Sequence, residues 1–183
     1  MSSRPIRAWS VRVPDSVLGY RETDADDADL DTFDAGDDEF ALEVNAFFRN
    51  RGWKKVPGAI CLQFGTRTEI VGYAAIGERS IPHPSQESIE TADYVIIYVM
   101  GVTRALHGEH DPGAPDGTSF AMTIFRTLET GFAKGLTGLS LHVRTRNGKA
   151  IHFYEKSGFG FDPEGDFIDR GKPTRIMRKI LDR

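Results

Sequence analysis

The residues best suited to do chemistry lie in one segment, residues 147–159, which reads Asn-Gly-Lys-Ala-Ile-His-Phe-Tyr-Glu-Lys-Ser-Gly-Phe. Within it, Tyr154 carries a phenol that can donate a proton to a leaving group as a general acid. Asn147 is a good N-cap for a short helix, and Gly158 is a good residue to end it. The segment therefore predicts a short helix that presents one proton donor, with the neighbouring ring of Phe153 facing the core.

The same segment resembles the fourth-helix motif of the GNAT superfamily of N-acetyltransferases, which transfer an acyl group from coenzyme A to an amine. The matching positions are Asn147, Ala150, Phe153, Tyr154, Glu155, Lys156, Gly158 and Phe159. The resemblance implies acetyl-CoA as cosubstrate and Tyr154 as the catalytic acid that protonates the departing thiolate. It also implies that Asn147 touches the cosubstrate. The alternatives are that Tyr154 is a packing residue and that Asn147 is only a helix cap.

Acetyl-CoA carries a pyrophosphate, and a helix N-terminus preceded by small residues can hold such an anion. Gly117, Thr118 and Ser119 precede an expected helix where the family has G-x-[GA], although Ala114 stands where it has Gln or Arg.

This register is the preferred one, and a second register is the alternative. His107 and Gly108 then supply the usual Gln-Gly or Arg-Gly pair, and residues 109–116 are an insertion. Both registers depart from the family motif, and the sequence leaves both open.

In the family, the pantetheine arm pairs with the fourth strand, so the backbone of Met100, Gly101 and Val102 is expected to bind it. An incoming ammonium must also lose a proton, and many GNAT enzymes use a glutamate on that strand; this strand has none. The candidate general bases are Glu78, Asp93, His83 and His107, and no spacing argument chooses between them. The α-amino group of an aminoacyl ester is already partly neutral and would need no strong base.

Hydrophobic periodicity and turn residues place the elements that must position these groups. Strands are expected at residues 6–13, 59–64, 69–77, 92–102, 139–143 and 174–181, and helices at residues 33–51, 119–134 and 147–157. This order resembles the GNAT order over nearly the whole chain. It implies an α/β GNAT fold in a single domain, residues 1–183. Its sheet would be mixed, mostly antiparallel and of six to seven strands, with helices on both faces and strands 4 and 5 splayed.

The composition limits the cellular setting. No apolar run approaches the roughly 20 residues of a membrane span, and the N-terminus lacks the apolar core of a secretory signal. The lone Cys61 cannot form an intramolecular disulfide, which suits a reducing cytoplasm. Cys and His do not occur at metal-ligand spacing, so no metal is expected.

Three hypotheses for the function remain. Between Glu22 and Glu43 there are 11 acidic residues and no Lys or Arg, either a solvated face or a negative rim that attracts a small cationic amine. Residues 33–36 (Phe-Asp-Ala-Gly) with residues 45–49 (Asn-Ala-Phe-Phe-Arg) are similar to GNAT toxins that acetylate aminoacyl-tRNA. The basic residues that could serve tRNA are Arg170, Lys172, Arg175, Arg178 and Lys179. The third hypothesis is a non-catalytic acyl-CoA-binding module. The sequence leaves open a homodimer and a toxin–antitoxin pairing.

Overall fold

The computed structural model describes residues 9–78 and 94–181. The chain divides into two compact units, Met1–Ala75 with Val99–Thr127, and Ile76–Tyr98 with Leu128–Arg183. Three elements contribute residues to both units: β4 (Ile70–Glu78), β5 (Tyr94–Val102) and α2 (Phe120–Phe132). The units are described in turn.

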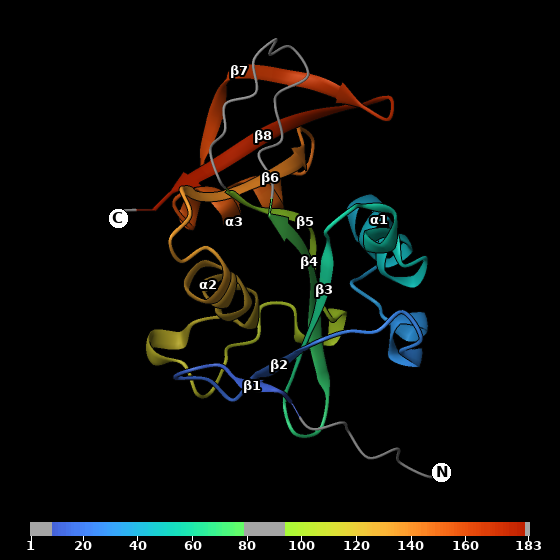
Figure 1. The fold of residues 1–183 in the computed structure, drawn as a ribbon, viewed down its shortest axis with the longest axis vertical. Coiled ribbons are helices and arrows are strands. Elements are labelled where there is room, and N and C mark those ends of the chain that lie inside the picture. Colours follow the sequence, from blue (N-terminus) through green and yellow to red (C-terminus); the bar gives the residue numbers. More distant parts are fainter. Residues whose placement is uncertain (1–8, 79–93, 182–183) are drawn as a thin grey trace. The chain divides into compact units, whose positions relative to one another are not determined.

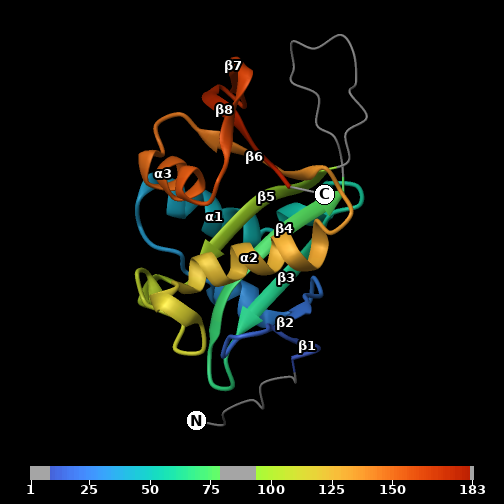
Figure 2. The same cartoon turned by 90° about the vertical axis from the view of Figure 1, so that its left-hand side faces the viewer.

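The first unit is a sheet with a helix on each face (Figures 1 and 2). Its strands follow the order β1-β2-β3-β4-β5, beginning with β1 (Val11–Arg12), β2 (Gly19–Glu22) and β3 (Ile60–Gly65). β2 pairs antiparallel with both β1 and β3, with Tyr20 opposite Phe64. One face is covered by α1 (Glu39–Arg49) and the other by the first half of α2. The 3-10 turns are Ala28–Thr32, Gly52–Lys55, Arg104–Leu106 and Pro115–Gly117.

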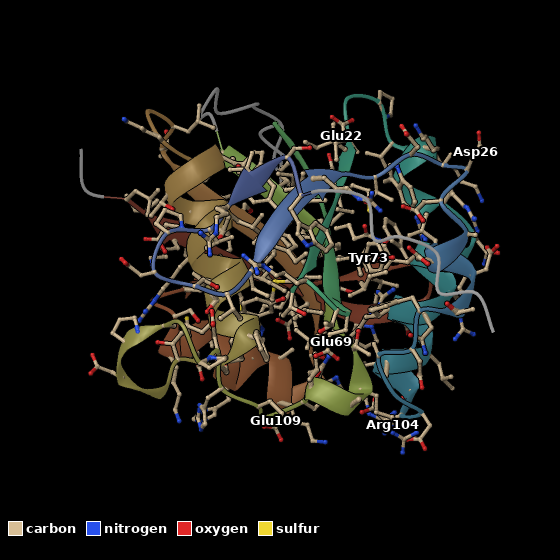
Figure 3. All side chains as sticks on the ribbon, turned by 90° about the horizontal axis from the view of Figure 1, so that it is seen from below. Glu22, Asp26, Glu69, Tyr73, Arg104 and Glu109 are labelled. Carbon is tan, nitrogen blue, oxygen red and sulfur yellow. The ribbon has the colours of Figure 1, made fainter. Side chains whose placement is uncertain are left out.

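An aromatic cluster fills the space between α1 and this sheet. The rings of Phe33 and Phe48 meet edge to face with centroids 5.5 Å apart, and both contact Tyr73, at 4.9 and 5.4 Å. Phe48 also lies beside Trp53, which is 1% exposed. Figure 3 shows Tyr73 inside the unit, between the strands and α1. Burial of these rings supplies much of the apolar contact that holds α1 in place.

The second unit is a sheet in the order β5-β6-β8-β7, with β6 (Gly138–Arg144), β7 (Gly160–Asp169) and β8 (Lys172–Ile180). β5 and β6 are parallel, and β8 is antiparallel to both β6 and β7. The β5–β6 pairing runs from Tyr94↔Gly138 to Ile97↔Leu141, although both strands continue beyond that point. The short helix α3 (Gly148–Lys156) follows β6.

Most of the expected elements are confirmed, including the parallel β5–β6 pair that parts beyond Leu141. Three expectations were wrong. Residues 33–38 form a turn and α1 begins only at Glu39, because the Asp38 side chain accepts hydrogen bonds from the amides of Phe40 and Ala41 and caps it there. β2 lies in a stretch expected to be loop, and β7 was not expected, so the described residues form eight strands. Of the opening strand, only Val11–Arg12 is found within the described residues.

Candidate active site

The predicted helix cap at Asn147 is confirmed. The Asn147 side-chain oxygen accepts a hydrogen bond from the amide of Ala150 at 3.1 Å, and α3 then runs to Lys156. The helix ends at Gly158, whose φ of +89° suits glycine and whose amide donates to the Glu155 carbonyl at 3.0 Å. These two ends fix the length of α3 and the place of Tyr154 on it.

Tyr154 lies in an aromatic setting on α3. Its ring is half-buried and meets Phe153 and Phe159 edge to face, with centroids 5.4 and 5.5 Å away. Burial raises the pKa of its hydroxyl to about 12. Among residues 9–78 and 94–181, no side chain or carbonyl forms a hydrogen bond with this hydroxyl. The phenol is therefore protonated at neutral pH, and its hydrogen-bonding capacity is left for a partner outside the described residues.

Phe153 does not lie in the core, which corrects the prediction. It is half-buried, and α3 contributes no fully buried side chain. The reason is that α3 buries none of its side chains completely, and the Phe153 ring meets the neighbouring Tyr154 ring edge to face. The buried residues of this segment are instead Ser157 and Phe159, which follow the helix.

The end of β5 is a place of close backbone approach in the first unit. A Cβ on Gly101 would lie 2.6 Å from Val44 Cγ1 of α1, and a Cβ on Gly72 would lie 2.4 Å from the Gly101 carbonyl oxygen. Both positions therefore need glycine for packing alone. The backbone of Met100, Gly101 and Val102 remains the predicted pantetheine partner.

His107 is tied to the same strand end. Its Nε2 lies 2.9 Å from the Val102 carbonyl oxygen. Because a carbonyl only accepts hydrogen bonds, Nε2 must carry the proton, and Nδ1 of the neutral ring then carries the free lone pair. His107 as a whole is an exposed residue.

The loop that carries both candidate phosphate registers folds back on itself. The Asp111 amide donates to the Thr118 carbonyl at 2.8 Å, and the Phe120 amide donates to the Glu109 carbonyl at 3.3 Å. Ser119 caps α2 by accepting from the Met122 amide at 3.3 Å. Several amides near the start of α2 are thus engaged within the loop itself.

Gly117 and Gly108 both have positive φ, +64° and +79°. A Cβ on Gly108 would meet nothing within 4 Å, and one on Gly117 would approach only the His110 ring at 3.7 Å. Gly108 therefore faces open space and Gly117 lies at ordinary contact distance from one ring, so the geometry is compatible with either register.

Asp111 organises this loop, although its role was not foreseen from the sequence. It is 1% exposed, and its carboxylate accepts from the amides of Val17 (3.3 Å) and Gly113 (3.0 Å). It also accepts from the hydroxyls of Thr123 (3.0 Å) and Ser16. The Asp-Pro-Gly sequence at residues 111–113 was the available signal, since it is typical of a turn.

The toxin-like residues 33–36 and 45–49 form one local hydrogen-bond network, which we call the knot around Asn45. Asn45 is 3% exposed; its Oδ1 accepts from the Ala35 amide (2.7 Å), and its Nδ2 donates to the Gly36 carbonyl (3.0 Å) and to Asp34 (3.3 Å). Arg49 donates twice to the Phe33 carbonyl, at 3.0 and 2.7 Å. The Gly36 amide, which donates to Asp34, is the largest cause of the lowered pKa of that carboxyl. These hydrogen bonds give the residues of the toxin-like motif a structural role in this turn.

Much of the acidic run is committed to contacts of this kind. Asp27 pairs with Arg21 and Asp37 with Arg104, each at 2.9 Å, and Asp31 pairs with Arg51. Figure 3 shows Glu22 and Asp26 at the periphery of the unit. The run is therefore less of a free negative rim than its composition suggests.

The four candidate bases are not brought together by the described residues. His83 and Asp93 lie outside those residues, and Glu78 is the last residue of β4.

Cys61 is 1% exposed and burial raises its pKa to about 12, so its thiol stays protonated. Within the part of the chain that the structure describes, no three metal-binding side chains cluster, and no helix is long and apolar enough to cross a membrane.

Solved structures share this architecture at low sequence identity. NAA60 from Arabidopsis thaliana, bound to a bisubstrate analogue, has a TM-score of 0.55 and 14% identity, covering 90% of this chain and 99% of its own. The ribosomal-protein-S18-alanine N-acetyltransferase of Escherichia coli has a TM-score of 0.54 and 13% identity, covering 91% of this chain and 95% of its own. A spermidine N-acetyltransferase chimera from Vibrio cholerae and hSSAT has a TM-score of 0.56 and 18% identity, covering 90% of this chain and 96% of its own. No protein-family model and no curated protein sequence matches the chain.

Proposed function

Because the chain has the fold of the GNAT N-acetyltransferases, we propose that it is an acetyl-CoA-dependent N-acetyltransferase. It transfers the acetyl group to a primary amine by direct attack within a ternary complex, as a single acetyltransferase domain. The observation that carries the proposal is Tyr154: a protonated hydroxyl on a capped helix, with no partner among the described residues.

In the proposed reaction, the amine nitrogen attacks the thioester carbonyl carbon and the carbon–sulfur bond breaks. The thiolate accepts the proton of Tyr154, and the proton released by the amine restores the phenol through solvent or a base. A phenol with a pKa of about 12 is always loaded with its proton at neutral pH. It is also a weak acid, so its main contribution is a hydrogen bond that strengthens as charge develops on sulfur.

For cosubstrate binding, the residues proposed are Asn147 in α3, the backbone of Met100 to Val102, and the loop with His107, Gly108 and residues 117–119. Among the candidate bases we favour His107, because its hydrogen bond to Val102 leaves Nδ1 as the acceptor. Glu78, His83 and Asp93 remain alternatives.

We consider two classes of acceptor. A small cationic amine is favoured by the acidic residues of the first unit that face solvent, such as Asp26. The amino group of aminoacyl-tRNA is favoured by the resemblance of residues 33–36 and 45–49 to the toxins and by the absence of a glutamate from β5. The toxin AtaT, bound to its antitoxin AtaR and acetyl-CoA, is among the solved structures of this fold, at 16% identity and a TM-score of 0.51. The homodimer and the cytoplasmic location stay predictions.

The test is release of free coenzyme A thiol from acetyl-CoA, measured against polyamines, amino acid amides and aminoacyl-tRNA. We expect release with one of these classes and much slower release by the Tyr154→Phe variant. Acetyl-CoA binding without release for any amine would identify a non-catalytic acyl-CoA-binding module. Absence of both binding and release would refute the proposal.

A further inference from the structure

One buried carboxylate, that of Asp111, joins three segments of the first unit. Asp111 is 1% exposed, and its Oδ1 accepts hydrogen bonds from the amides of Val17 (3.3 Å) and Gly113 (3.0 Å). Its Oδ2 accepts from the hydroxyl of Thr123 (3.0 Å) and from that of Ser16. These contacts tie the loop between β5 and α2 to the start of α2 and to the turn between β1 and β2.

The turn between β1 and β2 is a firm support for this loop. The Ser16 hydroxyl accepts from the Leu18 amide at 2.9 Å, and the Val13 amide donates to the Leu18 carbonyl at 3.0 Å. The loop lies so close to the turn that a Cβ on Gly113 would be 2.6 Å from the Val17 amide nitrogen, a distance that only glycine permits. Figure 1 shows the turn reaching the loop. The turn is thus fixed by its own hydrogen bonds and can hold the loop in place.

From Asp111 the restraint reaches the residues proposed to bind the pyrophosphate. The Asp111 amide donates to the Thr118 carbonyl at 2.8 Å, and the Asp111 carbonyl accepts from the Ala114 amide at 3.0 Å. Thr118 is the middle residue of 117–119, which lead into α2. The Thr123 contact holds the start of α2 against the same carboxylate. Asp111 is therefore bonded to both parts of the proposed phosphate site, the backbone before the helix and the helix itself.

We propose that Asp111 is a positioning residue for acetyl-CoA, because it fixes residues 117–119 and the start of α2 in the arrangement that binds the pyrophosphate. The inference rests on the proposed function, which gives this loop the pyrophosphate as its ligand. Backbone amides bind an anion well only when they are held in place, so the groups that lock them determine the affinity. The turn between β1 and β2 contributes no residue to the proposed acetyl-CoA site, yet it influences cosubstrate affinity through Ser16 and Val17.

The Asp111 side chain accepts every one of its hydrogen bonds, which suits a carboxylate and is impossible for an alanine. In Asp111→Ala the donors lose their common acceptor, and the loop is released from the turn and from α2. We expect Kd for acetyl-CoA to rise at least about tenfold, since small misplacements of binding groups cost that much or more. Asp111→Asn keeps one oxygen for the two amides, and its NH2 group can donate to the two hydroxyls, which also accept. Its affinity should therefore stay within about threefold of wild type.

The test is isothermal titration of each variant with acetyl-CoA and with acetyl-pantetheine, which lacks the pyrophosphate. In Asp111→Ala only the affinity for acetyl-CoA should fall, so the preference for acetyl-CoA over acetyl-pantetheine should shrink at least about tenfold. Ser16→Ala should shrink that preference by a smaller factor. Adding Ser16→Ala to Asp111→Ala should bring no further loss, because the two side chains form one contact.

The matched control is Asp27→Ala. The Asp27 side chain is 9% exposed and pairs with Arg21 at 2.9 Å, also in the first unit. Its loss should lower the stability of the chain and leave the preference for acetyl-CoA unchanged. A merely structural role of Asp111 would make Asp111→Ala behave as this control does.

An unchanged preference in both Asp111→Ala and Ser16→Ala would overturn the inference, and so would an equal loss for both ligands or an equal change in the control. If Asp111→Ala does not fold, Ser16→Ala decides by itself, since its preference either shrinks or does not. A wild-type chain that binds both ligands equally would also overturn the inference, while leaving acetyl transfer by Tyr154 intact. Conversely, a chain that binds acetyl-CoA through Asp111 but releases no coenzyme A with any amine would remove the proposed transfer and keep the inference. The two failures are thereby distinguished.

Discussion

The pKa of the Tyr154 hydroxyl depends on the side chains packed around it, which its place on α3 alone does not determine. The segment from Asn147 to Phe159 predicts where the phenol stands on the helix, and both helix ends are confirmed. The surrounding rings were not predictable in detail, because Phe153 and Phe159 both meet the Tyr154 ring edge to face, while Phe153 itself is only half-buried. Burial raises the pKa of the Tyr154 hydroxyl.

Replacing Tyr154 by phenylalanine removes one proton donor and little volume. We expect kcat to fall by about 10²- to 10⁴-fold, the usual range for general acid catalysis. Affinity for acetyl-CoA should change little, because the hydroxyl acts mainly in the transition state. Steady-state kinetics on the true acceptor check this, and an unchanged kcat would leave Tyr154 as a packing residue.

The raised pKa also has a consequence for stability. The folded pKa of Tyr154, about 12, lies above its ordinary value of 10. The folded state therefore holds this proton more tightly, and its stabilising effect, complete below pH 10, is lost as the pH rises toward 12. In urea titrations between pH 9 and 12, the free energy of unfolding should fall less steeply for Tyr154→Phe than for wild type. Parallel curves would show that the phenol is not protected by the fold.

At the scale of the elements, the hydrogen bonds around Asn45 show why residues 33–36 do not belong to α1, although the predicted helix included them. These residues form a turn, whose amides and carbonyls are satisfied by Asn45 and Arg49. Side-chain hydrogen bonds between residues about ten apart cannot be read from periodicity. β7 was missed for a related reason: Pro163 and Gly165 interrupt its alternation, and they lie between Phe161 and Asp166, where the register shifts. Such residues are tolerated because β7 is the last strand in the order.

Asn45→Ala should destabilise the first unit by about 1–3 kcal/mol, because the buried Ala35 amide loses its acceptor. Asn45→Asp should be at least as damaging, since a carboxylate would then face Asp34 where an amide now donates. Chemical denaturation measures both variants, with the exposed Asn50→Ala as the control, expected within about 0.5 kcal/mol of wild type. Equal stability of Asn45→Ala and the control would show that the knot is incidental.

Gly108 and Gly117 lie in the loop that is proposed to bind the pyrophosphate. Both have positive φ, so a valine at either position is strained. In the preferred register, Gly117→Val should weaken acetyl-CoA binding and Gly108→Val should not, once each is compared with its own unliganded stability. Isothermal titration with acetyl-CoA decides between them. A loss confined to Gly108→Val would assign the pyrophosphate to the pair of His107 and Gly108.

At the scale of the whole molecule, the order of elements carried more information than any single motif. The strands β5 and β6 and the capped helix α3 were predictable from apolar runs, a turn and a glycine stop, whereas the splayed pairing of the two strands was implied by the resemblance of the element order to the GNAT fold. The acidic run was visible as composition, but its use was not, because ion pairs such as Arg21–Asp27 join strands to turns that periodicity does not bring together.

Acetyl-CoA should stabilise the folded chain if it is the cosubstrate. A ligand at about a hundred times its Kd adds roughly 2.7 kcal/mol to the free energy of unfolding. For a chain of this size, each kcal/mol raises Tm by about 2–4 °C, so a shift of roughly 5–10 °C is expected. Acetyl-pantetheine lacks the pyrophosphate and should give a smaller shift at the same concentration, because it forgoes the loop amides and helix end that favour an anion. Differential scanning fluorimetry compares the two ligands directly.

Equal shifts would mean that the phosphates are not bound, and the loop from His107 to Ser119 would lose its proposed role while Tyr154 kept its own. A flat Tm with both ligands, at concentrations well above a micromolar Kd, would remove acetyl-CoA as the cosubstrate.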